Sequence, residues 1–432
     1  MPAAIMPPGA TVAPARAAGV RGWSSPGSRP DVIVAGAGVI GLGVAWRARL
    51  RGLTVTVVDP EPGSGASWTA AGMLAPLSEL HYGEKPLLAL NMASARRYPA
   101  FVEELERSSG TEVGYLRCGT LVAAWDGADM AGLRDIHGFA RSLGLETELL
   151  TRRQLRARVP ASASGLAGAL SAPDDHQVDN RLLHSALLRA CVAEGVTLLP
   201  TAARRWLLRG DRVVGLALAD GTDLTAPVVV LACGAWSGRI DGLPPGAVPA
   251  VRPVKGQTLR LRTVGSPLLT CVLRGSVRGC PVYLVPRADG RIVVGASSEE
   301  AGFDVRPRAG AVYELLRDAQ ALVPGLGEAE LEEVSTSLRP ASPDNAPLIG
   351  PSRIPGLLLA VGHYRNGVLL TPVTADAIAG LLADGALPDE VAAFTPARFD
   401  RTEDQAAGDQ AVEGRTVEEK AAADRTTRED VG

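Results

Sequence analysis

Residues 31–59 restrict the fold of this chain more than any other stretch, because they combine two strand patterns, a glycine turn and a helix in a fixed order. They read DVIVAGAGVIGLGVAWRARLRGLTVTVVD. The apolar run 31–35 predicts a strand, and the spacing over 39–51 predicts a helix that follows at once. The apolar run 53–58 then predicts a second strand. This order is typical of the βαβ unit of a parallel sheet.

Three glycines and one acid within this unit predict a dinucleotide site. Gly36 allows a tight turn, Gly38 lets the backbone approach a pyrophosphate, and Gly41 lets the helix pack closely on the strand. The helix N-terminus adds unpaired N–H groups and the positive end of a dipole for the phosphates. Asp59 follows about 20 residues later, where an acid accepts hydrogen bonds from the adenosine ribose. A purely structural glycine turn is the weaker alternative, because all the parts occur in order.

The composition is that of a globular protein and excludes several functional classes. The chain has 432 residues, of which 46% are hydrophobic and 21% are charged, which suffices for a sizeable core and more than one domain. Its net charge of −3 argues against binding nucleic acid, and no apolar run reaches the roughly 18 residues needed to cross a membrane. Neither the histidines nor the cysteines show metal-ligand spacing, so we expect no metal site. The scattered cysteines predict reduced thiols in a cytoplasmic protein: Cys118, Cys191, Cys233, Cys271 and Cys280.

Both ends of the chain are predicted to lie outside the folded part. Residues 1–29 are rich in Ala, Pro, Gly and Ser, which indicates a disordered extension or a misassigned start. A cleaved export signal is less favoured, because prolines interrupt the stretch. Residues 401–432 are charged and Ala-rich, which indicates a disordered, solvated tail.

The chain is predicted to return twice to its first sheet. Residues 226–237 form an apolar strand pattern that runs into a glycine turn, and 356–383 read as a strand, a polar glycine turn and a helix. The dinucleotide domain is therefore predicted to be discontinuous. Between these returns, 254–263 and 281–297 alternate in the manner of antiparallel strands.

The cofactor is left open between NAD(P) and FAD at this point. The returns place a second helix N-terminus at the same ligand, which favours FAD, because a helix end can stabilise negative charge on a reduced flavin. Small residues over 65–72 suit a backbone beside a large planar ligand, although an ordinary flexible loop has the same composition. Asn180 is predicted to cap the helix 181–194. No nucleophile–base pair is visible, so the chemistry is assigned to the cofactor.

The chain resembles the FAD-dependent amino-acid oxidases of the D-amino acid oxidase superfamily, and within it the glycine oxidases of thiamine biosynthesis. The motifs that carry this resemblance occur in the expected order over 31–383, so it covers nearly all of the chain except its two ends. They are DVIVAGAGVIGLGVAW, GASWTAAGMLAP, VVVLACGAWS, VKGQTLRL, VYLVPRADGRIVVGAS, SLRPASPDNAPLIG and GHYRNGVLLTP.

The resemblance implies a substrate site around one arginine. Arg339 would bind the substrate carboxylate, because a guanidinium matches a carboxylate with two parallel hydrogen bonds, and Tyr283 would assist. Taken alone, Arg339 would be expected in a surface salt bridge and Tyr283 half-buried on a strand. Arg365 would either join the site or only shape its turn. His363 would order that turn rather than act as a general base.

The resemblance also implies which residues hold FAD. No cysteine follows Cys280, so the covalent linkage of some superfamily members is excluded and FAD is expected to bind non-covalently. The predicted cofactor residues are Gly36, Gly38, Val39, Ile40, Gly41, Asp59, Pro60, Ala66, Ser67, Ala71, Gly72, Met73, His363, Tyr364, Arg365, Asn366, Gly367, Val368 and Leu369.

The expected fold is α/β with two domains. A doubly wound, Rossmann-like FAD-binding domain would be assembled from 31–110, 176–250 and 335–395. An α+β substrate domain with an antiparallel sheet would come from 111–175 and 251–334.

The implied reaction is the oxidative deamination of glycine or another small amino acid to an imine, with O₂ reduced to H₂O₂. Iminoacetate from glycine would then supply the thiazole of thiamine. The alternatives are a D-amino acid or sarcosine oxidase, a dehydrogenase that passes electrons to an acceptor other than oxygen, and a flavin-binding module without turnover. The implied partners are the small amino acid, O₂, the thiazole synthase system and further copies of the chain in a tetramer, without nucleic acid or a membrane.

Overall fold

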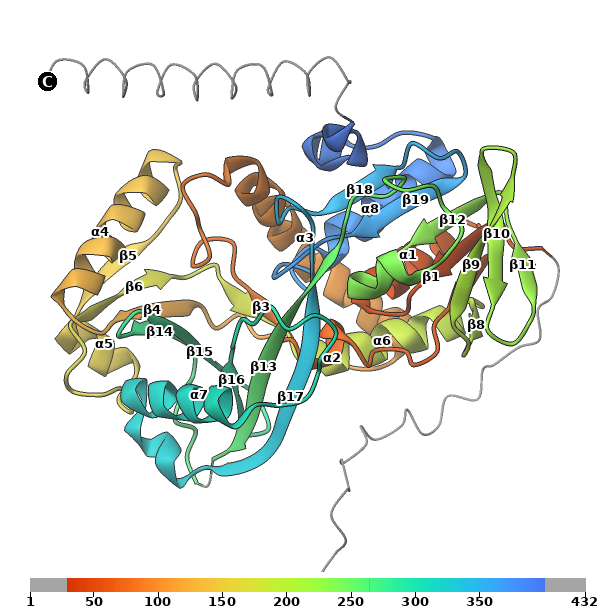
Figure 1. The fold of residues 1–432 in the computed structure, drawn as a ribbon. Helices are drawn as coiled ribbons and strands as arrows, with labels where there is room; N and C mark the ends of the chain where they lie inside the picture. The colour runs from red at the N-terminus through yellow and green to blue at the C-terminus, as the bar shows by residue number, and fades with distance from the viewer. Residues whose placement is uncertain (1–28, 264, 401–432) are drawn as a thin grey trace, which may run out of the picture.

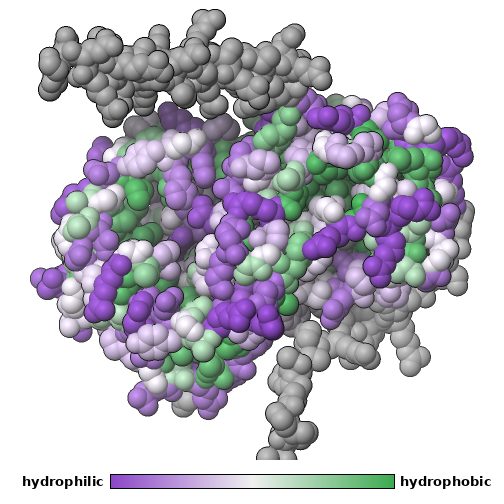
Figure 2. Space-filling model, in the orientation of Figure 1, coloured by the Kyte–Doolittle hydropathy of each residue, from purple (hydrophilic) through white to green (hydrophobic). Residues whose placement is uncertain are grey.

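The computed structural model describes residues 29–263 and 265–400. The predictions for the two ends, 1–29 and 401–432, fall almost wholly outside these residues. Figure 1 shows two lobes, one built on the strands near α1 and α8 and the other on the strands near α4, α5 and α7. On the face in Figure 2, hydrophilic side chains predominate and apolar ones gather in small groups. Among the described residues, no helix is both long enough and apolar enough to span a membrane.

The first lobe contains a six-stranded sheet in the order β18-β19-β12-β1-β2-β8. Its five strands from β19 to β8 are parallel, and β18 is antiparallel to β19. The sequence predicted the start of this sheet and both returns of the chain to it. The strands are β1 (Val32–Ala35), β2 (Val55–Val58), β8 (Thr197–Leu199), β12 (Val228–Leu231), β18 (Leu348–Pro351) and β19 (Leu357–Val361).

Helices cover one face of this sheet. They pack on Val32, Val34, Val55 and Val57, and α1 contacts both α6 and α8. Because side chains alternate between the faces of a strand, Ile33 and its equivalents point to the opposite face. The four helices are α1 (Val39–Leu50), α3 (Lys85–Ser109), α6 (Asn180–Ala193) and α8 (Thr371–Asp384).

A small antiparallel sheet covers the opposite face, where a doubly wound fold would have helices. Its order is β11-β10-β9, and it packs Trp206, Val213 and Leu216 on Ile33 and Val229. The predicted α/β class is confirmed, whereas this face is closed by strands instead of helices. These strands are β9 (Ala203–Arg209), β10 (Arg212–Leu218) and β11 (Asp223–Thr225).

The second lobe is built on an eight-stranded sheet in the order β17-β13-β16-β15-β14-β4-β6-β5. All neighbouring strands are antiparallel except β14 and β4, and α7 packs on the sheet through Leu315, Ala319 and Leu322. Its strands are β4 (Thr120–Ala124), β5 (Glu148–Thr151), β6 (Gly168–Ala172), β13 (Arg252–Arg262), β14 (Val272–Val277), β15 (Cys280–Pro286), β16 (Arg291–Gly295) and β17 (Glu330–Ala341). Its helices are α4 (Gly127–Ser142), α5 (Arg152–Arg158) and α7 (Ala309–Leu322).

One long strand carries the chain between the lobes, and several short elements complete the fold. Strand β17 continues across the predicted domain boundary at 334 and pairs with β13 along its whole length, so it carries the chain from one lobe to the other. The predicted division into domains otherwise stays a prediction. The short elements are α2 (Ala66–Thr69), β3 (Met73–Leu74), β7 (His176–Gln177), and the 3-10 helices Gly234–Arg239, Pro324–Glu328, Asp389–Phe394 and Pro396–Phe399.

One predicted helix start is wrong by a single residue. The side chain of Asp179, not Asn180, accepts hydrogen bonds from the backbone N–H groups of Arg181 and Leu182. Both residue types cap helices well, so the sequence does not decide between them. Asn180 instead donates to the carbonyl oxygens of Ser67 and Trp68, which lie beside the cavity described next.

Candidate active site

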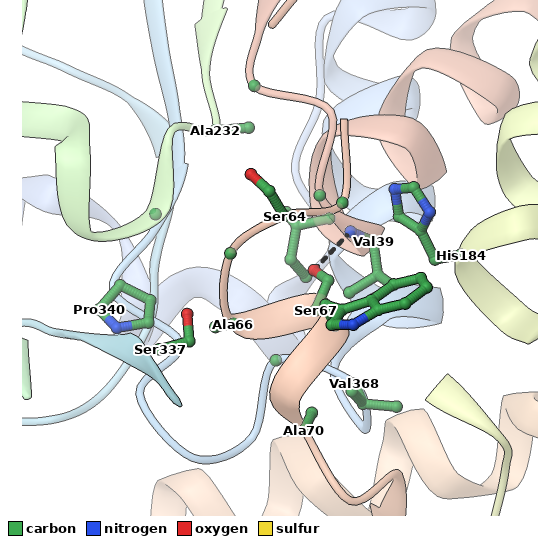
Figure 3. Close-up of a pocket in the computed structure, with 18 of the residues that line it drawn as sticks. Val39, Ser64, Ala66, Ser67, Ala70, His184, Ala232, Ser337, Pro340 and Val368 are labelled. Carbon is green, nitrogen blue, oxygen red and sulfur yellow. Dashed lines mark hydrogen bonds between the residues drawn. The ribbon is translucent and has the colours of Figure 1, made fainter. Parts of the chain in front are cut away.

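A cavity of about 1850 Å³ lies where the parallel strands of the first sheet end. Its wall includes Gly36 after β1, Asp59 after β2, Ala232 after β12 and His363 after β19. In open α/β sheets, ligands bind in the crevice outside the carboxyl ends of the strands. Figure 3 shows residues from different segments around one opening, among them Ala232, Pro340 and Val368.

The predicted site residues come together in this cavity. Arg339, Tyr283 and Arg365 all line it, as does every predicted cofactor residue except Gly41. A Cβ on Gly41 would overlap the Gly36 carbonyl, so Gly41 serves the close packing of helix on strand. The contacts of these residues with a ligand stay predictions.

The glycine turn is held by side chains on both sides of the Ala37 peptide. Asp59 Oδ2 accepts a hydrogen bond from Ala37 N at 2.7 Å, and burial raises the pKa of Asp59. The His184 Nε2–H donates to the Ala37 carbonyl oxygen at 2.9 Å, while burial lowers the pKa of His184. The imidazole is therefore neutral at pH 7, and it lies against Gly63. Sequence reasoning missed His184, which is 147 residues away from Ala37.

The small-residue loop around α2 continues the cavity wall, and its carbonyls are held from behind. The Trp68 carbonyl accepts hydrogen bonds from Arg181 Nε and Arg260 Nη2, both at 3.2 Å. The Ala71 carbonyl accepts one from Arg287 Nη2 at 2.7 Å. Burial lowers the pKa of Arg287 and lowers that of Arg260 to about 9. The buried guanidinium groups of Arg260 and Arg287 fix the loop. Both arginines lie within motifs quoted above, VKGQTLRL and VYLVPRADGRIVVGAS, but no role was predicted for either.

Ser67 joins this loop to the start of α1. Its Oγ accepts a hydrogen bond from Val39 N at 3.1 Å, as Figure 3 shows. A Cβ on Gly38 would lie 3.0 Å from the same oxygen. Gly38 lines the cavity, and a side chain at this position would crowd Ser67 Oγ, so glycine keeps the backbone accessible. A phosphate needs this close approach to a helix N-terminus.

The turn 363–369 forms the opposite wall, in front of α8. Two of its carbonyls face α3 rather than the cavity, since Leu369 O accepts from Ser94 Oγ at 2.6 Å and Val368 O accepts from the Tyr98 hydroxyl at 2.7 Å. Among the described residues, the backbone N–H groups of Gly367, Val368 and Leu369 have no hydrogen-bond partner. Unpaired N–H groups at a helix start suit the carbonyl and phosphate oxygens of a flavin nucleotide.

His363 orders this turn and is not suited to be a general base. Its Nε2 lies 3.0 Å from Thr374 Oγ1, and burial lowers its pKa to about 3. The ring is buried and neutral at pH 7, and its Nε2 partner, Thr374, lies on α8 rather than in the cavity.

Arg339 and Tyr283 lie together at the second-lobe side of the cavity. Arg339 extends from β17 across β13, where its guanidinium lies flat on Gly256, at 2.5–2.7 Å from the position of a Cβ. Its Nη1 donates to the Ser297 carbonyl at 3.0 Å. Tyr283 lies in the same way over Gly295, and burial raises the pKa of its hydroxyl.

No carboxylate of the described residues pairs with Arg339, and its Nη2 has no hydrogen-bond partner among them. An ordinary surface salt bridge is therefore not its role in this structure. A partly buried cation that lines a cavity and has no acidic partner among the described residues is suited to an anionic ligand.

The loop after β3 contributes to this end of the cavity. Glu79 lines the cavity and forms an ion pair with Arg274 at 2.9 Å. His81 Nε2 lies 3.1 Å from Arg365 Nη2. Arg365 is exposed and lies over the ring of Tyr364, so it stands at the rim of the cavity, whereas Arg339 is partly buried.

Comparison with known proteins identifies the family. The model of the family described as FAD dependent oxidoreductase matches residues 31–381. The chain belongs to this family. Its cofactor is FAD, and the open backbone at Gly38 and the unpaired N–H groups at Gly367–Leu369 fit such a ligand.

Several relatives and solved structures are similar over most of the chain. The bifunctional protein ThiO/ThiG of Synechocystis is 36% identical over 85% of this chain and 54% of its own length. The glycine oxidase of Geobacillus kaustophilus is 34% identical over 87% of this chain and 97% of its own. The crystal structure of glycine oxidase from that organism superimposes with a TM-score of 0.80, at 33% identity, and covers 86% of this chain and 100% of that one. The chain spans about half the length of the bifunctional relatives it matches.

Proposed function

We propose that this FAD-dependent oxidoreductase oxidises glycine, or another small amino acid, to the corresponding imine with O₂ as the electron acceptor. The observation that carries the proposal is Arg339, whose guanidinium has no acidic partner among the described residues and lies at one end of the dinucleotide cavity, next to the partly buried Tyr283. The similarity to glycine oxidases over nearly their whole length supports glycine as the substrate.

In this proposal the chain binds and orients the substrate, and the cofactor supplies the redox chemistry. Arg339 holds the carboxylate, and the protonated Tyr283 hydroxyl donates a hydrogen bond to it. Held at the carboxylate, the substrate presents its Cα–H bond towards the wall formed by 363–369. Bound FAD would supply the redox chemistry, which is the two-electron oxidation of the substrate and the reduction of O₂ to H₂O₂. No side-chain base is needed if the amine binds in its neutral form.

We assign the predicted cofactor residues to three parts of FAD. The turn from Gly36 to Gly41 would hold the pyrophosphate at the N-terminus of α1. Asp59 and Pro60 would lie at the adenosine ribose. Residues 66–73 and 363–369 would lie on either side of the flavin, with FAD bound non-covalently. The support is that these segments line one continuous cavity.

The proposed setting is a cytoplasmic enzyme whose imine product is used by a thiazole synthase. This rests on the relatives named ThiO/ThiG, of which the chain matches about half. A tetramer remains a prediction from the resemblance.

The proposal is tested by mixing the purified flavoprotein anaerobically with glycine, sarcosine, D-alanine or D-proline. We expect glycine to bleach the flavin absorbance, and we expect H₂O₂ when air is admitted. Faster bleaching by another of the four would move the substrate assignment to that compound. Bleaching without peroxide would show a dehydrogenase, and no bleaching with any of them would refute the oxidase assignment.

A further inference from the structure

A polar cluster lies on the strand that passes beneath the Arg339 guanidinium. The Lys255 side chain is 0% exposed, and its Nζ lies 3.2 Å from Glu299 Oε2. The other oxygen of this carboxylate accepts hydrogen bonds from Gln257 Nε2 at 2.6 Å and Ser297 Oγ at 2.7 Å. These four side chains, Lys255, Gln257, Ser297 and Glu299, are called the Glu299 cluster below.

The Glu299 cluster lies on the far side of β13 from the cavity. Gly256 faces Arg339, and successive side chains of a strand alternate, so Lys255 and Gln257 point to the opposite face. No member of the cluster lines the cavity. Its role is therefore not direct contact with a ligand.

Two backbone carbonyls connect the cluster to Arg339. Arg339 Nη1 donates to Ser297 O at 3.0 Å and to Lys255 O at 3.4 Å. Lys255 N in turn donates to Glu299 O at 2.9 Å, and Glu299 N donates to Lys255 O at 3.0 Å. Lys255 and Ser297 thus contact the Glu299 carboxylate with their side chains and accept hydrogen bonds from the Arg339 guanidinium with their backbone carbonyls.

Side-chain contacts matter here because the regular pairing of β13 with β16 ends at Gly295, and an isolated bridge between Lys255 and Glu299 follows. Strand β16 ends at Gly295, so Ser297 lies beyond it and its N–H reaches Gln257 O only at 3.3 Å. Among the described residues, Glu299 is the one acidic partner of the buried Lys255. Burial alone would raise the pKa of Glu299, but hydrogen bonds from Gln257 and Ser297 and the charge of Lys255 hold it below its ordinary value. Glu299 is therefore ionised at pH 7, and its carboxylate contacts Lys255, Gln257 and Ser297.

We propose that Glu299 is a positioning residue for substrate binding, which fixes the Ser297 and Lys255 carbonyls so that they direct the Arg339 guanidinium at the substrate carboxylate. The inference rests on the proposed function, in which Arg339 binds that carboxylate. Loss of this positioning weakens substrate binding and leaves the step that follows binding almost unchanged, so KM rises while kcat stays constant.

The test uses the holoenzyme and acetate, a carboxylate without an amine. The dissociation constant of acetate is measured from its effect on the flavin absorbance, and KM and kcat are measured with glycine. For Glu299→Gln we expect acetate to bind about tenfold more weakly and KM to rise by a similar factor, with kcat within about twofold. Ser297→Ala should act in the same direction while keeping the ion pair with Lys255, so it remains informative if Glu299→Gln fails to fold.

Glu300→Gln is the matched control. Glu300 is the next residue along the chain, and its ion pair with Arg252 is exposed, with side-chain exposures of 67% and 45%. We expect acetate affinity and KM unchanged in this variant, because exposed pairs contribute little.

Two results would overturn the inference. One is unchanged acetate affinity in a folded Glu299→Gln or Ser297→Ala enzyme, and the other is a fall in kcat without a change in KM. Arg339→Ala in the same titration distinguishes this failure from failure of the proposed function. If Arg339→Ala also leaves acetate affinity unchanged, Arg339 does not bind the carboxylate and the proposed function fails. If acetate affinity falls in Arg339→Ala but not in Glu299→Gln or Ser297→Ala, only the positioning role of Glu299 is refuted.

Discussion

Replacing Gly256 by alanine should displace Arg339 without disturbing the fold. A Cβ at this position would lie 2.5–2.7 Å from three guanidinium atoms, which is closer than real Cβ atoms come. The backbone of Gly256 is not in the left-handed region, and the atoms in conflict belong to the end of a flexible side chain. The relief is therefore a movement of the guanidinium and not of β13.

The cost follows from the bonds that the guanidinium would make. Hydrogen bonds to charged groups contribute about 1.5–3 kcal/mol, so losing the aligned arginine should weaken carboxylate binding about 10- to 150-fold. KM for glycine should rise by this factor, while the midpoint of thermal unfolding stays close to that of the wild type.

Steady-state oxygen consumption and circular dichroism provide the two measurements. Gly132→Ala is the control, because a Cβ there meets nothing within 4 Å on the surface of α4. An unchanged KM in a folded Gly256→Ala enzyme would refute the reasoning, since it would mean that the observed position of Arg339 is not the one that binds substrate.

Three further predictions concern the supports of the cavity. His184→Ala should weaken FAD binding to the apoprotein about 2- to 10-fold in a fluorescence titration, because the Ala37 carbonyl loses its hydrogen-bond donor. His137→Ala is the control, since it removes a contact with Thr147 away from the cavity, and equal FAD affinities in the two variants would contradict the role of His184. Arg287→Met should lower the free energy of unfolding, measured in urea, by about 3–5 kcal/mol, because it leaves Asp179 and the Ala71 carbonyl without their buried partner. A loss below about 1 kcal/mol would show that the buried ion pair is dispensable. Burial alone would raise the pKa of Glu333, but hydrogen bonds from Arg181 and Ser335 hold it at about 2, below the ordinary 4.5. The contribution of Glu333 to stability is therefore complete above pH 4.5 and is lost as the pH falls towards 2. Glu333→Gln should reduce the change of the unfolding free energy with pH over that range, and an unchanged pH profile in this variant would contradict the prediction.

The parts of the site that the sequence predicted are those with a local pattern. The turn at Gly36–Gly41 and the return at 363–369 each combine a strand, a glycine turn and a helix within a short stretch, and both line the cavity. Arg339 came from the resemblance, because an arginine in S-L-R-P carries no signal of its own.

The supporting side chains could not be predicted, because their partners are far away in the sequence. His184 contacts a peptide 147 residues earlier, and Arg287 contacts a carbonyl 216 residues earlier. A buried arginine or lysine looks like a surface residue in sequence until its acceptor is known. The cap of α6 shows the same limit at short range, because Asp179 and Asn180 are both good capping residues. In the structure Asn180 donates to the Ser67 and Trp68 carbonyls, and Asp179 caps the helix.

The central claim is that Arg339 binds the carboxylate of the substrate beside the flavin. The most direct measurement is the rate of anaerobic flavin bleaching by glycine as a function of glycine concentration, in the wild type and in Arg339→Ala. We expect saturation in the wild type and, in the variant, a rate that rises linearly with glycine over the same range without saturating. The same half-saturating concentration of glycine in both enzymes would contradict it.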